Sequence, residues 1–383
     1  MKQASRATLG DVADFINGLA FKPEDWETTG YKIIRIQNLT DKAKPYNLTN
    51  RKIDSKFIVN PGDLLVSWSA TLGVFQWDDE ESAVLNQHIF RVIPDEKKVY
   101  KPFLKFALDQ SVSTMDRHTH GATMKHINRA EFLNTPIHLP PLPEQKRIAA
   151  ILDKADAIRR KRQQAVKLTE ELLRSVFLDM FGDPVTNPKR WEKVTIRDLV
   201  SEVKYGTSEK ASYEGKYPIL RMNNITYKGG WDFTDLKRIN LPEKELSKYL
   251  VQKGDILFNR TNSKELVGKT AVYRQDSPMV YAGYLIRVSP NQQNCSEYIA
   301  AYLNSAHGKK TLENMCKNIV GMANINAQEL QEIPILKPPL DLQEQYNVTV
   351  QSVEAAKIKF QQAAYTSDTL FTSLLKRAFR GGL

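Results

Sequence analysis

The sequence predicts a mixed α/β protein made by internal duplication, in the order globular unit, long helix, globular unit, long helix. Three observations support this fold class. The stretch PPLPEQK (Pro140–Lys146) returns in similar form as PPLDLQEQ (Pro338–Gln345). A long segment of helical periodicity follows each copy, and β-rich segments precede each copy in the same order. Because a missed repeat misassigns the whole fold, this duplication is the first feature to establish.

The first long helix is predicted from Glu144 to Phe181, because apolar residues recur there every three or four positions. Gly182 and Pro184 end the pattern. A helix of this length extends about 57 Å at 1.5 Å per residue. The apolar stripe consists of Ile148, Ile151, Leu152, Ala155, Ile158, Ala165, Leu168, Leu172 and Val176.

The second long helix follows the second proline motif and has a heptad-like apolar seam. Its members are Val353, Ala356, Phe360, Ala363, Ser367, Leu370 and Leu374. A long helix with one apolar stripe needs a partner that covers the stripe. The two helices are therefore predicted to pair as an antiparallel coiled coil. The alternative is that each helix lies on its own globular unit.

The two globular units resemble each other segment by segment. YKIIRIQNLT corresponds to YPILRMNNIT, VNPGDLLVSW to VQKGDILFNR, HIFRVIP to YLIRVSP, and GATMKHIN to GMANIN. Short apolar runs such as Ile33–Ile36 and Asp63–Val66 are bounded by Gly, Pro and Asn and are predicted to be strands. The tracts PFLKFALDQS and EYIAAYLNSAHGKKTLENM are predicted to be helical. The order of strands in the sheets stays open.

Composition favours a cytoplasmic protein that binds a polyanion. The 383 residues carry a net charge of +11 with a pI near 9.3, and nucleic acid is a common partner of such a surplus, with ribosome-like or membrane-surface contacts as alternatives. Cys295 and Cys316 are the only cysteines, which fits a reducing compartment. The N-terminus lacks the apolar core of a signal peptide, and no apolar run is long enough to span a bilayer.

Motifs for catalysis are absent or incomplete in the sequence. ELVGKTA (Glu265–Ala271) ends like a phosphate-binding loop, but Ser263 stands where that motif needs glycine. No Asn/Asp-Pro-Pro-aromatic motif of a DNA methyltransferase occurs, and Glu96–Lys98 and Glu214–Lys216 are chance-level candidates for a nuclease. The sequence therefore predicts a binding protein without catalytic residues.

Three histidines, His118, His120 and His126, cluster in DRHTHGATMKH and raise the question of a metal site. The second unit has no histidine at the matching positions. We therefore interpret the cluster as a surface loop or a loop that faces DNA, and predict no metal.

Candidate DNA contacts are the polar residues that follow short strands in both units, since Arg suits guanine, Asn or Gln suits adenine, and Lys and Arg suit phosphates. A scaffold role is the alternative, because Asn and Ser also cap turns and Arg35 and Arg221 could pair with buried acids. The candidates are Arg35, Gln37, Asn38, Ser67, Trp68, Ser69, Lys125, Arg221, Asn223, Asn224, Asn259, Arg260, Asn262 and Ser263.

Several of these segments together resemble the specificity subunit of a type I restriction–modification system. They are LPPLPEQKRIAAIL, FLDMFGDP, GDILFNRTNSKELVGKTAVY, LNQHIFRV and the C-terminal LLKRAFRG. The resemblance spans nearly the whole chain. It implies target-recognition domains at residues 1–141 and 183–338 and conserved helical spacers at 142–182 and 339–383. It also implies that this subunit has no catalytic site of its own.

The resemblance implies that each recognition domain binds one half of a bipartite, asymmetric DNA target while the helices set the spacing. Two modification subunits using S-adenosylmethionine would dock against the helical regions, and restriction subunits using ATP and Mg would join them. The predicted partner contacts are Glu144, Gln145, Arg147, Phe181, Glu344, Gln345 and Phe379. No cofactor is expected on this chain.

The sequence departs from the family pattern in two places, and two other functions remain as alternatives. The second helix begins PPLDLQEQYNV instead of PPLPEQKRI, and the chain ends shortly after Arg380. The first of these differences leaves open whether the two helices engage their modification subunits equally. The alternatives are a restriction-enzyme subunit with its own nuclease site and a structural adaptor that does not bind DNA.

Overall fold

The computed structural model describes residues 5–118, 127–316 and 321–383. Lys125, His120 and His126 therefore lie outside the described residues. The chain divides into two compact units, Met1–Gln163 with Gln361–Leu383, and Gln164–Phe360. Both divisions fall inside the long helices, so each unit contains one globular domain and part of both helices. The predicted limits of the four segments stay a prediction.

The first globular domain contains two four-stranded sheets and one two-stranded sheet, with strand orders β2-β9-β6-β7, β4-β3-β8-β5 and β1-β10. The first sheet is antiparallel, and the second includes one parallel pair, β3 with β8. The strands are β1 (Ser5–Thr8), β2 (Ala13–Asn17), β3 (Tyr31–Ile34), β4 (Asn47–Thr49), β5 (Ile58–Val59), β6 (Leu64–Ser67), β7 (Gly73–Gln76), β8 (Ala83–Leu85), β9 (Ile89–Pro94) and β10 (Pro136–Leu139). The helices are α1 (Leu9–Val12), η1 (Pro23–Asp25), α2 (Ile36–Thr40), η2 (Ser55–Phe57), α3 (Lys101–His118) and α4 (Arg129–Leu133).

The second globular domain repeats this topology with strand orders β12-β20-β16-β18, β14-β13-β19-β15 and β11-β22, and adds the pair β17-β21. The strands are β11 (Glu192–Thr195), β12 (Val200–Tyr205), β13 (Tyr217–Leu220), β14 (Lys237–Ile239), β15 (Leu250–Val251), β16 (Ile256–Asn259), β17 (Thr261–Asn262), β18 (Thr270–Val272), β19 (Met279–Tyr281), β20 (Leu285–Pro290), β21 (Ala323–Asn324) and β22 (Pro334–Lys337). The helices are α6 (Ile196–Leu199), η3 (Met222–Asn224), α7 (Glu243–Tyr249), α8 (Ser296–Asn304), α9 (Ala306–Met315) and α10 (Ala327–Gln331).

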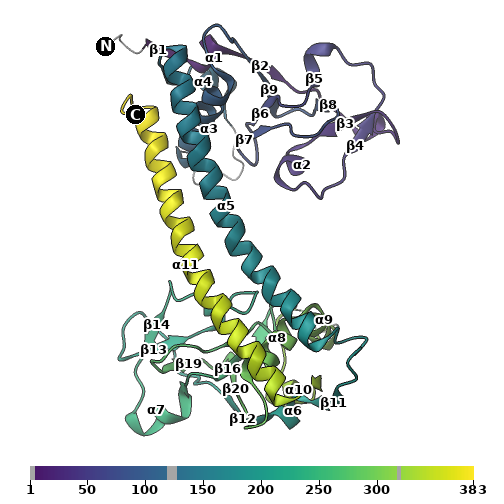
Figure 1. Cartoon of the computed structure of the whole chain (residues 1–383), viewed down its shortest axis with the longest axis vertical. Coiled ribbons are helices and arrows are strands. Elements are labelled where there is room, and N and C mark those ends of the chain that lie inside the picture. The colour runs from purple at the N-terminus through teal and green to yellow at the C-terminus, as the bar shows by residue number, and fades with distance from the viewer. Residues whose placement is uncertain (1–4, 119–126, 317–320) are drawn as a thin grey trace. The chain divides into compact units, whose positions relative to one another are not determined.

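The two long helices are α5 (Leu142–Phe181) and α11 (Leu340–Ala378), labelled in Figure 1. They run antiparallel in each unit. In the first unit Arg162 Nη1 donates to Ala363 O over 3.0 Å. In the second, Lys357 Nζ lies 3.3 Å from Glu170 Oε1, and the rings of Phe177 and Tyr346 are 5.9 Å apart. The predicted antiparallel pair and the mixed α/β duplication are therefore confirmed.

The end of α5 follows the sequence closely. Gly182 has φ +82, a left-handed conformation that glycine adopts readily, and its N–H donates to Leu178 O over 2.8 Å. This bond satisfies one of the carbonyls left unpaired at a helix C-terminus. The predicted stop at Gly182 is confirmed.

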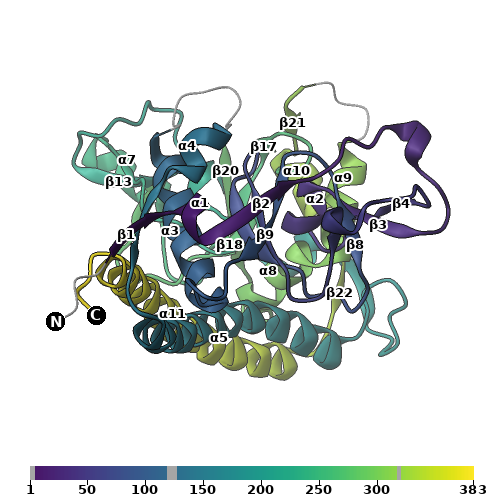
Figure 2. The same ribbon diagram turned by 90° about the horizontal axis from the view of Figure 1, so that it is seen from above.

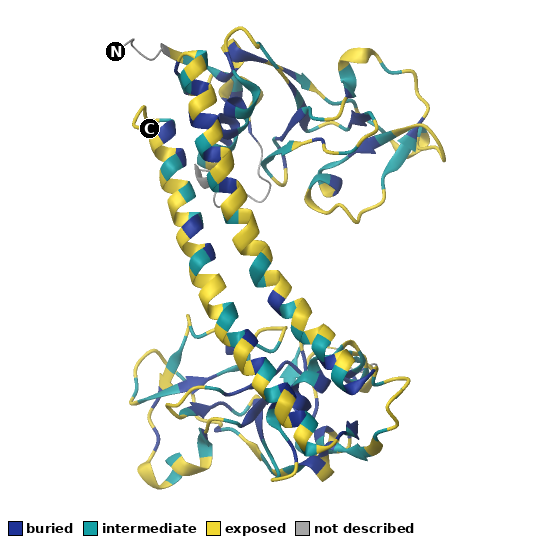
Figure 3. Cartoon of the chain, in the orientation of Figure 1, coloured by how far each residue is buried: buried dark blue, intermediate teal, exposed yellow. Residues whose placement is uncertain are grey.

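The predicted apolar stripes are only partly buried, as the yellow bands along both helices in Figure 3 illustrate. Ile148 and Leu152 are buried, but Leu168 and Leu172 are 51% and 49% exposed. In α11, Val353 and Ser367 are buried, whereas Phe360 and Leu370 are 40% and 57% exposed. Ile158 is also exposed. A narrow antiparallel contact covers only part of a stripe, so several residues of the predicted stripes stay exposed although the helices pair.

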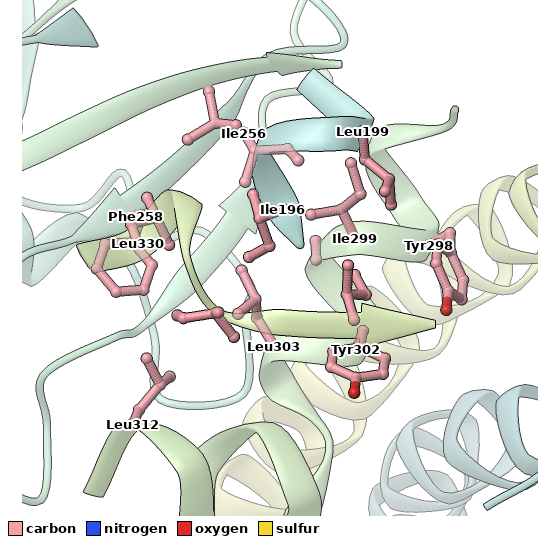
Figure 4. Packing of buried hydrophobic residues seen from close by; sticks show 14 of the residues in the cluster. Ile196, Leu199, Ile256, Phe258, Tyr298, Ile299, Tyr302, Leu303, Leu312 and Leu330 are labelled. Atoms are coloured by element: carbon pink, nitrogen blue, oxygen red, sulfur yellow. The ribbon is translucent and has the colours of Figure 1, made fainter. Parts of the chain in front are cut away.

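Each domain packs a helix between its antiparallel sheet and the long helices. In the first unit, side chains of β2, β6, β9, α3, α5 and α11 share one buried cluster, and Figure 2 shows α3 between the sheet and the helices. In the second unit, Ile299 and Leu303 of α8 lie toward Ile196, Leu199 and Ile256 (Figure 4). Tyr298, on another face of α8, packs against Phe177 and Phe181 of α5. These clusters hold one face of each antiparallel sheet in place. The candidate DNA contacts lie at one end of each sheet. None of the described helices combines the length and apolarity needed to cross a lipid bilayer.

Candidate nucleic-acid interface

The antiparallel sheet of the first domain ends in a cluster of polar and aromatic side chains. β2 ends at Asn17 and β6 at Ser67, so Trp68 follows directly at the same end of the sheet. Trp68 Nε1 donates to Asn17 Oδ1 over 3.2 Å. The Trp68 ring lies edge-on to His88 at 4.8 Å and stacks on Phe90 at 5.6 Å. Trp68 is therefore held in place by its neighbours.

The equivalent end of the second domain carries a different set. β12 ends at Tyr205 and β16 at Asn259, and Arg260 follows. The Arg260 guanidinium lies 4.8 Å from the Tyr205 ring centre, and its Nε donates to Asn324 Oδ1 over 3.0 Å. Tyr284, at the turn before β20, is 56% exposed. This arrangement orients a cation at the edge of the domain.

Asn38 and Asn224 hold the loops after β3 and β13. Each is buried, at 3% and 2% exposure. Asn38 Oδ1 accepts from Arg35 N, and its amide donates to Lys44 O and Pro45 O. Asn224 makes the same kind of bonds with Arg221 N, Asp232 O and Asp235 O. Both asparagines therefore have an internal role in this structure, as the scaffold alternative proposed.

Their neighbours Gln37 and Asn223 are exposed, so these loops do present amides to solvent. Arg221 Nη2 donates to Asp235 Oδ2 over 2.7 Å, and Asp235 is half-exposed, not a buried acid. The Arg35 guanidinium lies 5.9 Å from the Trp26 ring centre, and no acidic side chain among the described residues forms an ion pair with it. A base or phosphate contact by these residues stays a prediction.

The remaining predicted DNA contacts differ in accessibility. Ser67 and Asn259 are fully buried and Ser69 is 6% exposed, so these three side chains lie inside the domains. Asn262 and Ser263 are half-buried, with Ser263 N donating to Asn262 Oδ1 over 2.9 Å. The structure thus brings together Trp68 with Asn17 and Arg260 with Tyr205, and leaves the small polar residues as loop supports.

The Gly-Lys-Thr segment of the second domain is structural. Lys269 is buried, and its Nζ donates to Met222 O over 2.5 Å and to Ile225 O over 2.6 Å. Burial lowers the pKa of Lys269, since desolvation disfavours the ammonium. This lysine therefore fixes the loop that carries Asn223, a use that differs from phosphate binding.

The repeated proline motifs position a buried glutamine at the start of each long helix. Gln145 Nε2 donates to Pro140 O over 2.8 Å and to Lys98 O, and its Oε1 accepts from Tyr100 N. Gln343 Nε2 donates to Pro338 O over 2.9 Å and to Asn294 Oδ1, and its Oε1 accepts from Cys295 N. Sequence reasoning missed Gln343, although it follows its proline pair at the same spacing as Gln145.

The predicted partner contacts also divide into internal and accessible residues. Gln145 and Phe181 are 1% and 2% exposed and offer no side-chain surface to a partner in this structure. Phe379 is half-buried with its ring 5.2 Å from that of Phe103. Arg147 pairs with Glu144 at 2.6 Å on the surface. Glu344 and Gln345 are exposed. Their contacts with a partner stay predictions.

The described residues contain no group of three or more His, Cys, Asp or Glu side chains suited to a metal ion. Two of the three clustered histidines lie outside these residues, so their role stays a prediction. What the domains offer chemically is hydrogen-bond donors, cations and aromatic faces at the ends of two rigid sheets.

Comparisons with known proteins point to one family. The family described as type I restriction modification DNA specificity domain matches residues 2–168 and 188–364. The chain is 26% identical to the EcoKI specificity subunit of Escherichia coli K12 over 76% of this chain and 68% of that protein. It is 24% identical to the EcoBI specificity subunit of Escherichia coli over 99% and 86%.

Solved structures agree on the fold. The S subunit of a type I restriction–modification system from M. genitalium matches with a TM-score of 0.62 and 16% identity, over 98% of this chain and 96% of that one. A chain from a structural study of complex assembly and conformational transition of the type I R-M system matches with a TM-score of 0.56 and 18% identity, over 100% and 99%.

Proposed function

Because the chain belongs to the type I restriction–modification DNA specificity family, we propose that it recognises a bipartite DNA target, with one domain on each half. The observation that carries this proposal is the duplicated sheet whose exposed end bears Trp68 in one copy and Arg260 in the other. Two similar scaffolds with different side chains suit two different half-sites. The surplus of 55 Lys and Arg over 44 Asp and Glu supplies the attraction to phosphates.

The long helices would set the spacing and bind two modification subunits. Exposed apolar side chains on α5 and α11 support this part of the proposal, since large exposed apolar residues mark interaction sites when they gather on one element. They include Ile158, Leu168, Leu172, Leu178, Val348, Ile358, Phe360, Tyr365 and Leu370. Restriction subunits would join the resulting core.

Cofactors would belong to the partners. The modification subunits are proposed to use S-adenosylmethionine and the restriction subunits ATP and Mg. This chain would supply DNA recognition and assembly, in a cytoplasmic complex. A nuclease site of its own and a role without DNA binding have no observation in their favour.

Methylation-sensitive sequencing tests the proposal. A host that expresses this chain with its modification subunit should carry a split, adenine-methylated motif in its DNA. Exchange of residues 183–338 for the corresponding domain of a relative should change one half of the motif and leave the other half intact. A stable complex that methylates no split motif would contradict the proposed function.

A further inference from the structure

The two antiparallel sheets share a register that makes their ends comparable residue by residue. Asn17 faces Phe90 across β2 and β9, and Tyr205 faces Ile286 across β12 and β20. Ser67 faces Ile89, and Asn259 faces Leu285. The register therefore pairs three positions at the end of each sheet, namely Asn17 with Tyr205, Trp68 with Arg260, and His88 with Tyr284.

The backbone at these positions is held by the same hydrogen bonds in both domains. Trp68 N donates to His88 O over 3.2 Å, and Arg260 N donates to Tyr284 O over 3.0 Å. Ile127 N donates to Trp68 O over 3.0 Å, and Ile325 N donates to Arg260 O over 2.9 Å. The scaffold under the three positions is thus common to both copies.

The buried side chains beside these positions keep their character in both domains. Ile89 with Leu285 and Val66 with Phe258 are apolar, and Ser67 with Asn259 is polar. At the three end positions an amide is replaced by a phenol, an indole by a guanidinium, and an imidazole by a phenol. Asn17, Tyr205 and Tyr284 are exposed, so packing does not require their side chains, whereas Trp68, His88 and Arg260 are half-buried.

We infer that these three positions in each domain determine its half-site, with Arg260 contacting a guanine and Asn17 contacting an adenine. This inference rests on the proposed function. Guanidinium groups pair with the O6 and N7 acceptors of guanine, and asparagine amides with N6 and N7 of adenine.

The geometry supports Arg260 as a base contact. Its Nε is bound by Asn324 and its plane is near the Tyr205 ring, so the side chain loses little freedom when it binds. Among the residues that the structure describes, neither of its Nη groups has a hydrogen-bond partner. Thr261 Oγ1 also donates to Asn324 Oδ1 over 2.9 Å, which fixes the amide that orients the arginine.

Asn17 is oriented in a comparable way by a different neighbour. Its Oδ1 accepts from Trp68 Nε1, while the indole is itself fixed between His88 and Phe90. Within the described part of the chain, the oxygen keeps a second lone pair and the amide nitrogen keeps both donors for a base edge. The same position in the second domain is a tyrosine, which excludes this contact there.

The test uses the full chain assembled with its modification subunit. Arg260→Gln should change the preferred base from guanine toward adenine at one position of the second domain's half-site. Arg260→Ala should weaken discrimination there by roughly 5- to 150-fold. Asn17→Ala should weaken discrimination by a similar factor at one position of the other half-site only. Methylation-sensitive sequencing and competition binding with substituted duplexes would measure both effects.

Lys253→Ala is the matched control, since it removes a positive charge at the opposite end of β16, where Lys253 pairs with Asp276 at 2.7 Å. It should lower affinity evenly without a change of motif, and thermal melts should show that all variants fold. If the unmodified chain methylates a split motif that the Arg260 and Asn17 variants leave unchanged, the inference is overturned while the proposed function stands. If the unmodified chain methylates no split motif, the proposed function itself fails.

Discussion

The two recognition domains share buried polar residues that hold their loops, and they differ in the side chains at the ends of their antiparallel sheets. Asn38 and Asn224 make matching buried hydrogen bonds, and so do Gln145 and Gln343. Trp68 and Arg260, at matching positions at the ends of the sheets, share no chemistry. A buried polar residue that is repeated in a duplicated protein therefore points first to the scaffold, and an accessible residue that diverges on a repeated backbone points to specificity.

The domains also stabilise similar loops by different means. The loop after β13 is held by the buried Lys269 and by the Arg221–Asp235 pair. In the first domain the register places Gly73 where Lys269 stands, because Ser67 faces Gly73 and Phe258 faces Thr270. The loop after β3 in the first domain is thus held by Asn38 without a buried lysine. The asparagine present in both domains and the lysine present only in the second can therefore be tested separately.

The largest effect is expected where both domains share a close backbone approach. A Cβ on Gly206 would lie 2.3 Å from Tyr281 O, and one on Gly18 would lie 2.1 Å from Asn86 O. Gly206→Ala and Gly18→Ala should each destabilise their own domain by about 3 kcal/mol or more, because the obstacle is backbone. Hydrogen exchange resolved by peptide would measure this loss domain by domain.

Gly230→Ala is the control, because a Cβ there would meet only the Thr226 hydroxyl, at 3.2 Å. Its effect should stay small. Equal loss of protection in both domains for either glycine variant would contradict the assignment of each glycine to its own domain.

Much of the fold was predictable because it depends on local patterns. Helical periodicity, the proline entry and the stop at Gly182 predict α5 without knowledge of tertiary contacts. The apolar stripe was less informative, since Leu168 and Leu172 fit the period but stay exposed. Periodicity indicates which residues can be buried, while the width of the actual contact decides which ones are.

The candidate site was predictable only in part, because it depends on strand register. Trp68 and Arg260 follow recognisable strands, but Asn17, His88, Tyr205 and Tyr284 join them only through pairing across the sheet. Repetition in the sequence drew attention to Asn38 and Asn224, which proved to be buried. Burial of a short polar side chain in a loop leaves no signature in a single sequence.

A half-buried carboxyl in the first unit should produce a large, pH-dependent effect. Burial raises the pKa of Asp109 to about 6. Tyr100 N and Cys295 N donate to the buried glutamines of their units in the same way, so these two residues occupy equivalent positions. Asn304, nine residues after Cys295, is therefore the equivalent of Asp109, nine residues after Tyr100. Asp109→Asn would therefore give the first unit the side chain that the second unit already has.

The folded chain keeps this proton up to about pH 6, whereas the unfolded chain loses it near pH 4, so stability falls as pH rises through that interval. Asp109→Asn should remove this slope and raise the free energy of unfolding above pH 6 by up to roughly 3 kcal/mol. Urea unfolding between pH 4 and 8 would measure the gain, with the exposed Asp14→Asn as control. An unchanged slope would show that Asp109 is not the titrating group.

The shared amides should have equal and moderate effects in the two domains. Asn38→Ala and Asn224→Ala each remove two part-buried hydrogen bonds to backbone carbonyls, at a cost of about 2 kcal/mol. The exposed neighbours provide matched controls, because Gln37→Ala and Asn223→Ala should change stability by less than about 0.5 kcal/mol. Thermal unfolding would distinguish the pairs. If Gln37→Ala weakens DNA binding while stability is unchanged, the loop contacts DNA; if Asn38→Ala leaves stability unchanged, the scaffold assignment fails.

The smallest effect is expected at Glu170, which provides the opposite pH dependence in the second unit. Its carboxylate lies 2.5 Å from Lys228 Nζ and 3.3 Å from Lys357 Nζ. Burial opposes ionisation, but the two lysines outweigh it and lower the pKa of Glu170. Glu170→Gln should cost under about 1 kcal/mol at neutral pH, since surface pairs contribute little.

The effect of Glu170 should depend on pH. Because its pKa is lowered in the folded chain, the carboxylate stabilises the fold above the ordinary glutamate pKa, and this stabilisation is lost on acidification. The difference between Glu170→Gln and the unmodified chain should therefore vanish at low pH, whereas the difference for Asp109→Asn should appear only as the pH rises. The exposed Glu171→Gln should show neither trend, and parallel urea titrations of the three variants would establish whether the two units respond to pH with opposite sign.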